Sequence, residues 1–284
     1  MVRMKKNRAV SSLVWVFLRT VILLFFVCVM LYPFLWMISG TFKTAGELMQ
    51  VPPTLIPHMP TLDNYREVFK KIDILGRMYW NSLFVGLVIP VVQTVVCLPA
   101  AYAFANLRFR GKKIVFLAFM GSMMLPVQLT IIQNYVTMSR LKLINNPGSL
   151  ILLGTFGAMC IFMMRQFFLT LPRELDEAAR IDGCGIFRSF VRIAIPLAKP
   201  IISTNIILCF NAAWGDFYTP MLFLKRLEVM TLPVGMTVLS GAYNTQSPAV
   251  MVTAMTVSII PVVIVYLLFR RQLIAGIATT GIKV

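Results

Sequence analysis

Charged residues are scarce in this sequence, and acidic ones are scarcer than basic ones. Asp, Glu, Lys and Arg make up only 13% of the chain, against 58% hydrophobic residues, and the mean hydropathy is +0.82. Soluble domains carry about 25% charged residues, so this composition excludes a soluble globular protein and indicates an integral membrane protein. The net charge of +17 is carried by basic residues that flank apolar segments. Because they form no stripe among stacking aromatics, no nucleic-acid partner is expected.

Groups that bind metals or perform catalysis are also nearly missing. The single histidine, His58, lies in a Pro-rich stretch. The cysteines have no CxxC spacing and no histidine neighbours, which argues against a disulfide framework or a zinc site; they are Cys28, Cys97, Cys160, Cys184 and Cys209. No GxxxxGK[ST] phosphate loop occurs. We therefore expect no catalytic residue, no metal site and no cofactor bound by this chain.

Long apolar segments are what the sequence has in abundance. A membrane-spanning helix needs about 20 predominantly apolar residues. Six segments qualify as spans, over residues 21–38, 81–107, 114–139, 149–164, 201–224 and 249–269. A basic leader (residues 1–20) precedes them and a tail (272–284) follows, so the expected transmembrane domain covers 21–271. Basic residues cluster in the leader, at 108–113 and after the sixth span, and the positive-inside rule then places both termini in the cytoplasm.

Two of the connecting segments are long enough for structure of their own. Residues 41–79 are expected to form an external segment with one short amphipathic helix near 63–71. Residues 172–200 carry nine charged residues. Each charge costs about 2.5–3.5 kcal/mol at the centre of a bilayer, so this second segment must lie outside the membrane.

The segment 172–200 has the pattern of a helix–turn–helix. Acidic residues occupy the first turn of the first helix, where they favour the positive end of its dipole. Gly183 can take the left-handed conformation that ends a helix. The first helix is expected to present one thin face made of Leu175, Ala178, Ala179 and Asp182. The second is expected to turn Ile186, Phe187, Phe190 and Val191 toward the membrane domain, with Arg188 and Arg192 at its wet edge.

Here the sequence resembles a known family. EAARIDG (177–183), followed by IAIPLAKP (193–200), is similar to the EAA loop of ABC-importer permease subunits. Nearly the whole chain resembles sugar-importer permeases of the maltose type, through YPFLWMISGTFK, LDNY, NSL, LPAAYAFANLRFRGK, QNYVTMSRLKLINNPGSLIL, NAAWGDF, TLPVGM and GIATTGIKV. One departure is Gly215, where relatives commonly carry asparagine.

The resemblance implies a type I ABC importer permease, all-α with six transmembrane helices, in a bacterial cytoplasmic (inner) membrane. It implies carbohydrate as the solute, and as partners a second homologous permease in a heterodimer, two ABC ATPase subunits and an extracytoplasmic solute-binding protein, besides membrane lipid. ATP and Mg would bind to the ATPase subunits. In that family the EAA loop docks in a cleft of the ATPase, which assigns ATPase coupling to Glu177, Ala178, Ala179, Asp182 and Gly183.

Polar side chains at membrane depth tend to face a bundle interior or a water path. The candidates for a solute pathway are Gln128, Gln133, Asn134, Asn205, Asn211, Trp214, Asp216 and Tyr218. The alternative is that the amides bridge helices and that Asp216 sits near the external interface. The tail 272–284 is open to two interpretations, a contact with the ATPase dimer or an end without fixed structure.

Two other functions compete with sugar import. A permease of the same type could carry glycerol phosphate, but a phosphate calls for cationic pathway residues and no Lys or Arg lies in the predicted spans. A self-contained secondary transporter usually has several intramembrane carboxylates, and Asp216 alone is available. Neither the particular solute nor the permease subunit that selects it follows from the sequence.

Overall fold

The computed structural model describes residues 2–70, 72–172, 174–241 and 247–281. Every regular element within these ranges is a helix, so the all-helical prediction is confirmed for the part described. Contacts divide the chain into two compact units, residues 1–71 with 243–257, and residues 72–242 with 258–284.

The first unit begins with the long helix α1 (Val2–Gly40), followed by α2 (Ala45–Leu48) and α3 (Asp63–Lys70). The opening turns of α15 (Pro248–Gly281) also belong to it. The part of α1 from Trp15 to Gly40 is apolar, long enough to cross a membrane, and unburied. The helix starts well before the predicted span at residue 21, because the basic leader continues it without a break.

The connection between α1 and α3 is folded around buried polar groups. Asn64 donates from Nδ2 to the carbonyls of Thr41 (2.9 Å) and Lys43 (2.8 Å) and is 7% exposed. The Lys43 ammonium donates to the carbonyl of Thr54 and lies 5.9 Å from the ring centroid of Trp36. These partners offset the cost of burying polar groups. The hydrogen bonds therefore hold the segment between α1 and α3 in a defined conformation.

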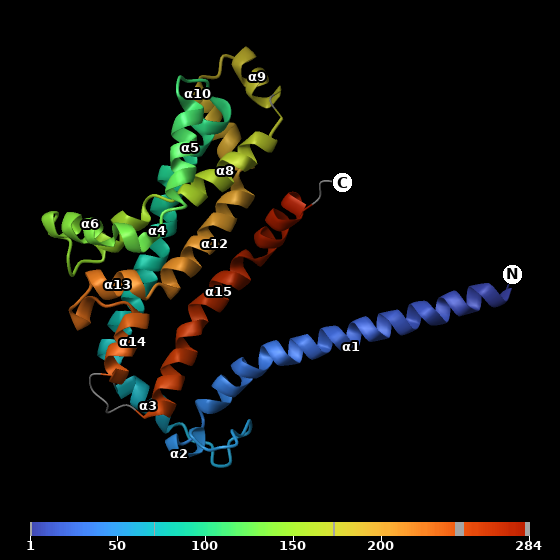
Figure 1. Ribbon diagram of the computed structural model, residues 1–284, viewed down its shortest axis with the longest axis vertical. Helices are drawn as coiled ribbons and strands as arrows, with labels where there is room; N and C mark the ends of the chain where they lie inside the picture. Colours follow the sequence, from blue (N-terminus) through green and yellow to red (C-terminus); the bar gives the residue numbers. More distant parts are fainter. Residues whose placement is uncertain (1, 71, 173, 242–246, 282–284) are drawn as a thin grey trace. The chain divides into compact units, whose positions relative to one another are not determined.

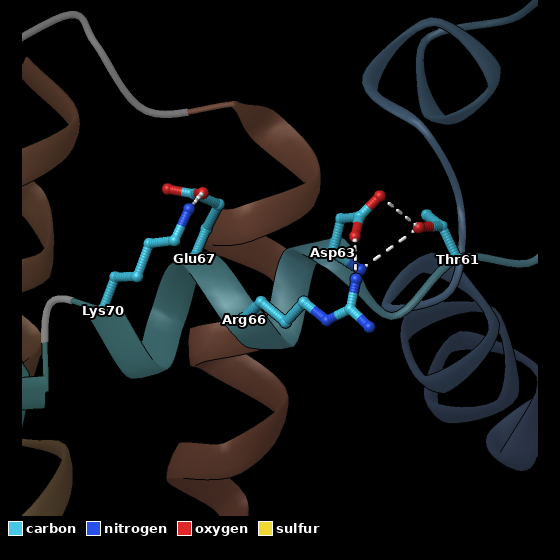
Figure 2. Close-up of polar contacts among 5 residues, drawn as sticks. All are labelled: Thr61, Asp63, Arg66, Glu67 and Lys70. Atoms are coloured by element: carbon cyan, nitrogen blue, oxygen red, sulfur yellow. Dashed lines mark hydrogen bonds and ion pairs between the residues drawn. The ribbon is translucent and has the colours of Figure 1, made fainter.

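Helix α3 matches the predicted amphipathic helix near 63–71. The Asp63 carboxylate accepts from the Thr61 hydroxyl (2.8 Å) and from Arg66 (3.0 Å), as Figure 2 shows. The hydrogen bond from Thr61 lowers the pKa of Asp63 below its ordinary value. Because the pKa of Asp63 is lower in the folded than in the unfolded protein, its carboxylate stabilises the fold at pH values above the pKa of the unfolded state. This stabilisation is lost as the pH falls through the pKa of the folded state. Lys70 pairs with Glu67 at 2.6 Å one turn later, and such exposed pairs contribute little.

The second unit is built around α4 (Ile72–Asn106), which packs against α8 (Ala158–Thr170) and α12 (Lys199–Gly215). One core cluster contains Tyr102, Met164 and Phe168, and another contains Val85, Leu150 and Phe223. Helices α9 (Glu174–Ile181) and α10 (Ile186–Ser189) lie at one end of this bundle (Figure 1). Helices α13 (Tyr218–Phe223) and α14 (Leu232–Gly241) lie at the other end.

Several predicted spans are broken helices. The third, 114–139, is divided into α5 (Lys112–Ser122) and α6 (Val127–Arg140), because Pro126 lacks an N–H donor and disfavours helix at the residue before it. The fourth is divided into α7 (Gly148–Gly154) and α8, with a bend of 43° between them. Each of these two predicted spans is therefore made of two helices rather than one.

The fifth predicted span, 201–224, is also discontinuous. Helix α12 ends at Gly215, and α13 begins only at Tyr218. Before α12, the chain passes from α10 through the π-helix η1 (Phe190–Ala194) and α11 (Ile195–Leu197), and the axis turns by 71°. Two proline-containing helices run longer than predicted: α4 begins at Ile72, and α15 continues to Gly281, through most of the predicted tail.

Three helices of the described residues are long and apolar enough to cross a membrane: Trp15–Gly40, Asp73–Asn106 and Pro248–Leu268. The number rises to five if each of the two bent pairs forms one span. The protein is thus an all-helical chain with several candidate membrane spans.

Asn145 fixes the turn that follows α13. Its backbone is left-handed, with φ of 60°, and its N–H donates to the carbonyl of Phe223 at 2.8 Å. Its Oδ1 accepts from the N–H groups of Lys225 (2.6 Å) and Arg226 (3.1 Å). Farther along the turn, Asn81 of α4 donates to the carbonyl of Glu228, within the 3-10 helix η2 (Leu227–Val229), and to the carbonyl of Met230, just after it. Amides from two other parts of the unit therefore hold this turn.

The first prediction concerns this turn. Asn145→Ala removes the shared acceptor and places a residue with an ordinary Cβ in the left-handed region, so we expect the unfolding free energy to fall by about 2 kcal/mol. Asn145→Asp keeps both the acceptor and the tolerance for that conformation, and it serves as the matched control. Thermal unfolding of the detergent-solubilised protein measures both variants. Equal losses for Ala and Asp would contradict the role given to Oδ1.

Candidate functional site

The segment 172–200 folds into the predicted helix–turn–helix. Helix α9 is followed by Gly183, whose φ of +73° is the left-handed conformation that ends a helix. The N–H of Cys184 returns to the carbonyl of Ala179 at 2.8 Å, and the N–H of Asp182 to that of Ala178 at 3.0 Å. These bonds close the last turn of α9 before α10 begins.

The two alanines of this helix do not share one exposed face. Glu177, Ala178 and Asp182 are exposed, whereas Ala179 is only 5% exposed and packs inward. Leu175 and Ile181 add exposed apolar surface to the same helix. The thin face predicted for docking therefore lacks Ala179, which is buried.

The second helix also differs from the prediction. Phe190 is buried, with its ring centroid 5.0 Å from that of Tyr102 on α4. Ile186, Phe187 and Val191 are exposed, Phe187 at 79%, so of the four predicted residues only Phe190 is buried against the bundle. Arg188 and Arg192 are exposed, as predicted. One aromatic side chain thus fixes this helix to the bundle and leaves an apolar surface uncovered beside the charges.

A hollow of about 590 Å³ lies between this loop and the end of α4. Glu177 and Ile186 line it from the loop, and Arg108 and Lys112 line it from the turn after α4. The Lys112 ammonium donates to the carbonyls of Ala105 (3.1 Å) and Leu107 (2.8 Å), which lie at the C-terminal end of the helix. Cations are favoured at the C-terminal end of a helix. Arg108 and Lys112 thus place positive charge in the hollow that the exposed Glu177 carboxylate also lines.

A second cavity, of about 640 Å³, lies among α4, α6, the α7–α8 break, α12 and α13. Its wall is mainly apolar, with a few hydroxyl, amide and carboxyl side chains, which are Gln93, Ser122, Thr130, Asn134, Asp216 and Thr219. One oxygen of Asp216 accepts from the N–H of Thr219 at 3.1 Å, so this carboxylate also caps the start of α13. No Lys, Arg or His is among the lining residues.

The cavity contains two of the predicted pathway residues, Asn134 and Asp216. Gln133, Asn211 and Tyr218 are exposed and lie outside its lining. The backbone of Gln128 lies in α6, but its side chain is outside the described part of the structure. The pathway assignment stays a prediction for all of these residues.

Two other predicted pathway residues are packing residues in this conformation. Asn205 is 2% exposed and donates to the Thr94 hydroxyl at 3.3 Å, which bridges α12 to α4. Trp214 is 8% exposed, stacks on Phe210 with centroids 5.8 Å apart, and meets Tyr79 edge to face. Its ring faces are therefore covered by aromatic neighbours rather than open to a sugar.

Sequence reasoning missed Gln93 and Thr130. Gln93 is the one amide between residues 82 and 105, four positions after Ile89 and four before Cys97. That spacing places all three on one face of a helix, and this is the signal that could have identified it.

These features define a class of protein, an all-helical membrane protein with a rigid charged helix–turn–helix at one end of its bundle and a weakly polar cavity within it. A family model described as "Binding-protein-dependent transport system inner membrane component" matches residues 74–278. The chain belongs to this family and is therefore a transport permease of an inner membrane.

Curated relatives cover nearly the whole chain. The arabinooligosaccharides transport system permease protein AraQ of Halalkalibacterium halodurans is 30% identical over 280 residues, which is 98% of this chain and 99% of the relative. The sn-glycerol-3-phosphate transport system permease protein UgpE of Brucella abortus is 30% identical, with the same coverage of both chains. A solved bacterial ABC transporter that imports the acidic polysaccharide alginate is 25% identical, with a TM-score of 0.80, over 92% of this chain and 97% of its own.

The second prediction compares two glycines of the loop. A Cβ at Gly183 would meet no atom within 4 Å, but φ of +73° is unfavourable for alanine by about 1–2 kcal/mol. Gly185 has equal room and an ordinary φ of -68°. We expect Gly183→Ala to speed tryptic cleavage within 172–200 about tenfold, because local opening becomes easier. Gly185→Ala should cleave like the parent protein. The role of the left-handed turn is refuted if the two variants cleave at the same rate.

Proposed function

We propose that this chain is the permease subunit of an ATP-driven, binding-protein-dependent importer of a carbohydrate, a sugar or an oligosaccharide. The observation that carries the proposal is the helix–turn–helix of 172–200. It is anchored to the bundle by Phe190, whose ring packs against Tyr102, and it exposes Glu177, Ala178 and Asp182 beside apolar side chains. An anchored element with an exposed mixed surface suits force transmission from a partner.

The partner that we propose at this surface is an ABC ATPase, with two such subunits in the assembly. ATP and Mg would bind to those subunits, and this chain would hold no cofactor. Glu177, Ala178 and Asp182 would contact the ATPase, while Ala179 and Gly183 would give the loop its shape. The helical continuation of α15 to Gly281 is compatible with a tail that reaches the same partner.

The remaining assembly is proposed from the family and the topology. Six membrane spans with both termini in the cytoplasm would place the segment 41–79 and the turn near Lys225 outside, facing an extracytoplasmic solute-binding protein. A second, homologous permease would complete the pathway as a heterodimer in a bacterial cytoplasmic membrane. The unburied apolar surface of α1 supports a location against lipid or another permease.

The charge of the cavity favours a neutral solute. Names of relatives include both a neutral oligosaccharide and glycerol phosphate as cargo. The cavity lining has amides, hydroxyls and one carboxylate, and it has no cation. These groups hydrogen-bond sugar hydroxyls, whereas a phosphate beside Asp216 would meet a like charge. A permease for glycerol phosphate is the second candidate, and it is disfavoured by this lining.

The third prediction tests transport itself. The complete importer, purified with its co-expressed partner chains and reconstituted in vesicles, should accumulate labelled arabinotriose or another neutral oligosaccharide only with ATP and the binding protein. sn-Glycerol-3-phosphate should not compete. Glu177→Lys should remain in the membrane but lose uptake, because it reverses the charge of the coupling surface. Accumulation by this chain reconstituted alone would contradict the proposal and favour a self-contained transporter.

The fourth prediction isolates the charge in the cavity. Asp216→Asn keeps the oxygen that accepts from Thr219 and removes only the negative charge. We expect uptake of the neutral probe to fall about tenfold or more, because about one hydrogen bond to a charged group is lost, and we expect inhibition by sn-glycerol-3-phosphate to increase. Asp216→Glu, which keeps the negative charge, is the control and should keep the discrimination against sn-glycerol-3-phosphate. If Asp216→Asn transports like the parent with unchanged selectivity, Asp216 does not contact the solute.

A further inference from the structure

The break between α7 and α8 lies directly against one face of α4. Helix α7 ends at Gly154 and α8 begins at Ala158, with the bend of 43° between them. Ile89, Gln93 and Cys97 of α4 follow one another at intervals of four residues and face this break. The packing is close enough that a Cβ at Gly154 would lie 2.6 Å from Ile89 Cγ2.

Gln93 supplies a hydrogen bond that the broken helix lacks. The carbonyls in the last turn of a helix have no helical donor, and backbone polar groups at membrane depth need a partner from protein or from a water-lined cavity. Gln93 donates from Nε2 to the carbonyl of Gly154 at 3.0 Å. Four residues later, the Cys97 thiol lies 3.8 Å from the carbonyl of Gly157. Two side chains on one face of α4 therefore contact the carbonyls at the two ends of the break.

The amide fits only because the residue opposite has no side chain. A Cβ at Gly157 would lie 2.8 Å from Gln93 Nε2 and 3.0 Å from its Cδ. These distances are shorter than a van der Waals contact, so alanine at 157 would displace the amide from its position. Gln93 and Gly157 are thus sterically matched.

The same residues form a wall of the larger cavity. Gln93, Gly154 and Gly157 all line it, together with Asn134 and Asp216 from other helices. A change in the angle of the break would move this wall and alter the shape of the cavity.

We propose that Gln93 is a positioning residue for transport, which holds the α7–α8 break at its angle and so sets the shape of the solute cavity. This inference rests on the proposed function for its consequence, since the cavity is taken as part of the solute pathway. The hydrogen bond from Gln93 to the carbonyl of Gly154 is observed in the structure and does not depend on the proposed function.

The test is a double-mutant cycle in the complete importer. Gln93→Met keeps the length of the side chain and removes the donor, and Gly157→Ala displaces the amide. We expect each to speed hydrogen exchange of the amides at 154–158 about fivefold, the loss of one ordinary hydrogen bond. The cycle itself uses Gln93→Ala, which also removes the donor and should speed exchange at least as much as Gln93→Met. In that background Gly157→Ala should add no further increase, because the colliding amide is absent. Gln166→Met, an exposed amide on α8, is the control.

Uptake of labelled arabinotriose gives the second measurement. We expect Gln93→Met to raise the KM about fivefold with the maximal rate unchanged, whereas a general loss of folded protein would lower the maximal rate. The inference is overturned if exchange at 154–158 is unchanged in Gln93→Met, if the two substitutions multiply in the cycle, or if only the maximal rate falls. Absence of uptake by the parent importer would instead count against the proposed function, and the exchange cycle would still decide the role of Gln93.

Discussion

Hydrogen bonding of the backbone inside an apolar medium is the constraint on which this structure depends. A continuous helix satisfies its own backbone, whereas every break exposes carbonyl and N–H groups that need another partner. In the bundle around α4, the carbonyl of Gly154 takes the amide of Gln93, and the carbonyls at the end of α4 take the ammonium of Lys112. Several polar side chains of an otherwise apolar unit therefore bond to the backbone where helices end or bend.

The charged segment 172–200 is attached to the apolar bundle by apolar contacts. Helices α9 and α10 lie at one end of the second unit (Figure 1), and the aromatic contact of Phe190, just after α10, with Tyr102 attaches the loop to the bundle. Glu177, Asp182 and Phe187 remain exposed. A loop that is fixed on one side and exposed on the other can move with the bundle as a body, which is the mechanical requirement for coupling to a partner.

Relatives with nearly complete coverage carry names with different cargoes, an arabinooligosaccharide system and a glycerol-3-phosphate system. A shared architecture thus leaves the cargo open, because a fold supports many functions and a site determines each one. In this chain the cavity has Asp216 among amides and hydroxyls, and no cation is among its lining residues. The proposal of a neutral solute rests on these few residues and not on overall sequence similarity.

The sequence alone determined the all-helical class, the apolar segments and the helix–turn–helix with its left-handed Gly183, because these follow from composition, from periodicity and from the conformational freedom of one residue. It did not determine where helices break, since Pro90 and Pro99 lie within the continuous α4 whereas Pro126 marks an interruption. Nor did it determine which polar residues meet: Asn205 and Trp214 pack between helices, and Gln93 and Asp216 line one cavity. Only the tertiary structure decided these points, because the partner of a buried polar group comes from a distant part of the chain.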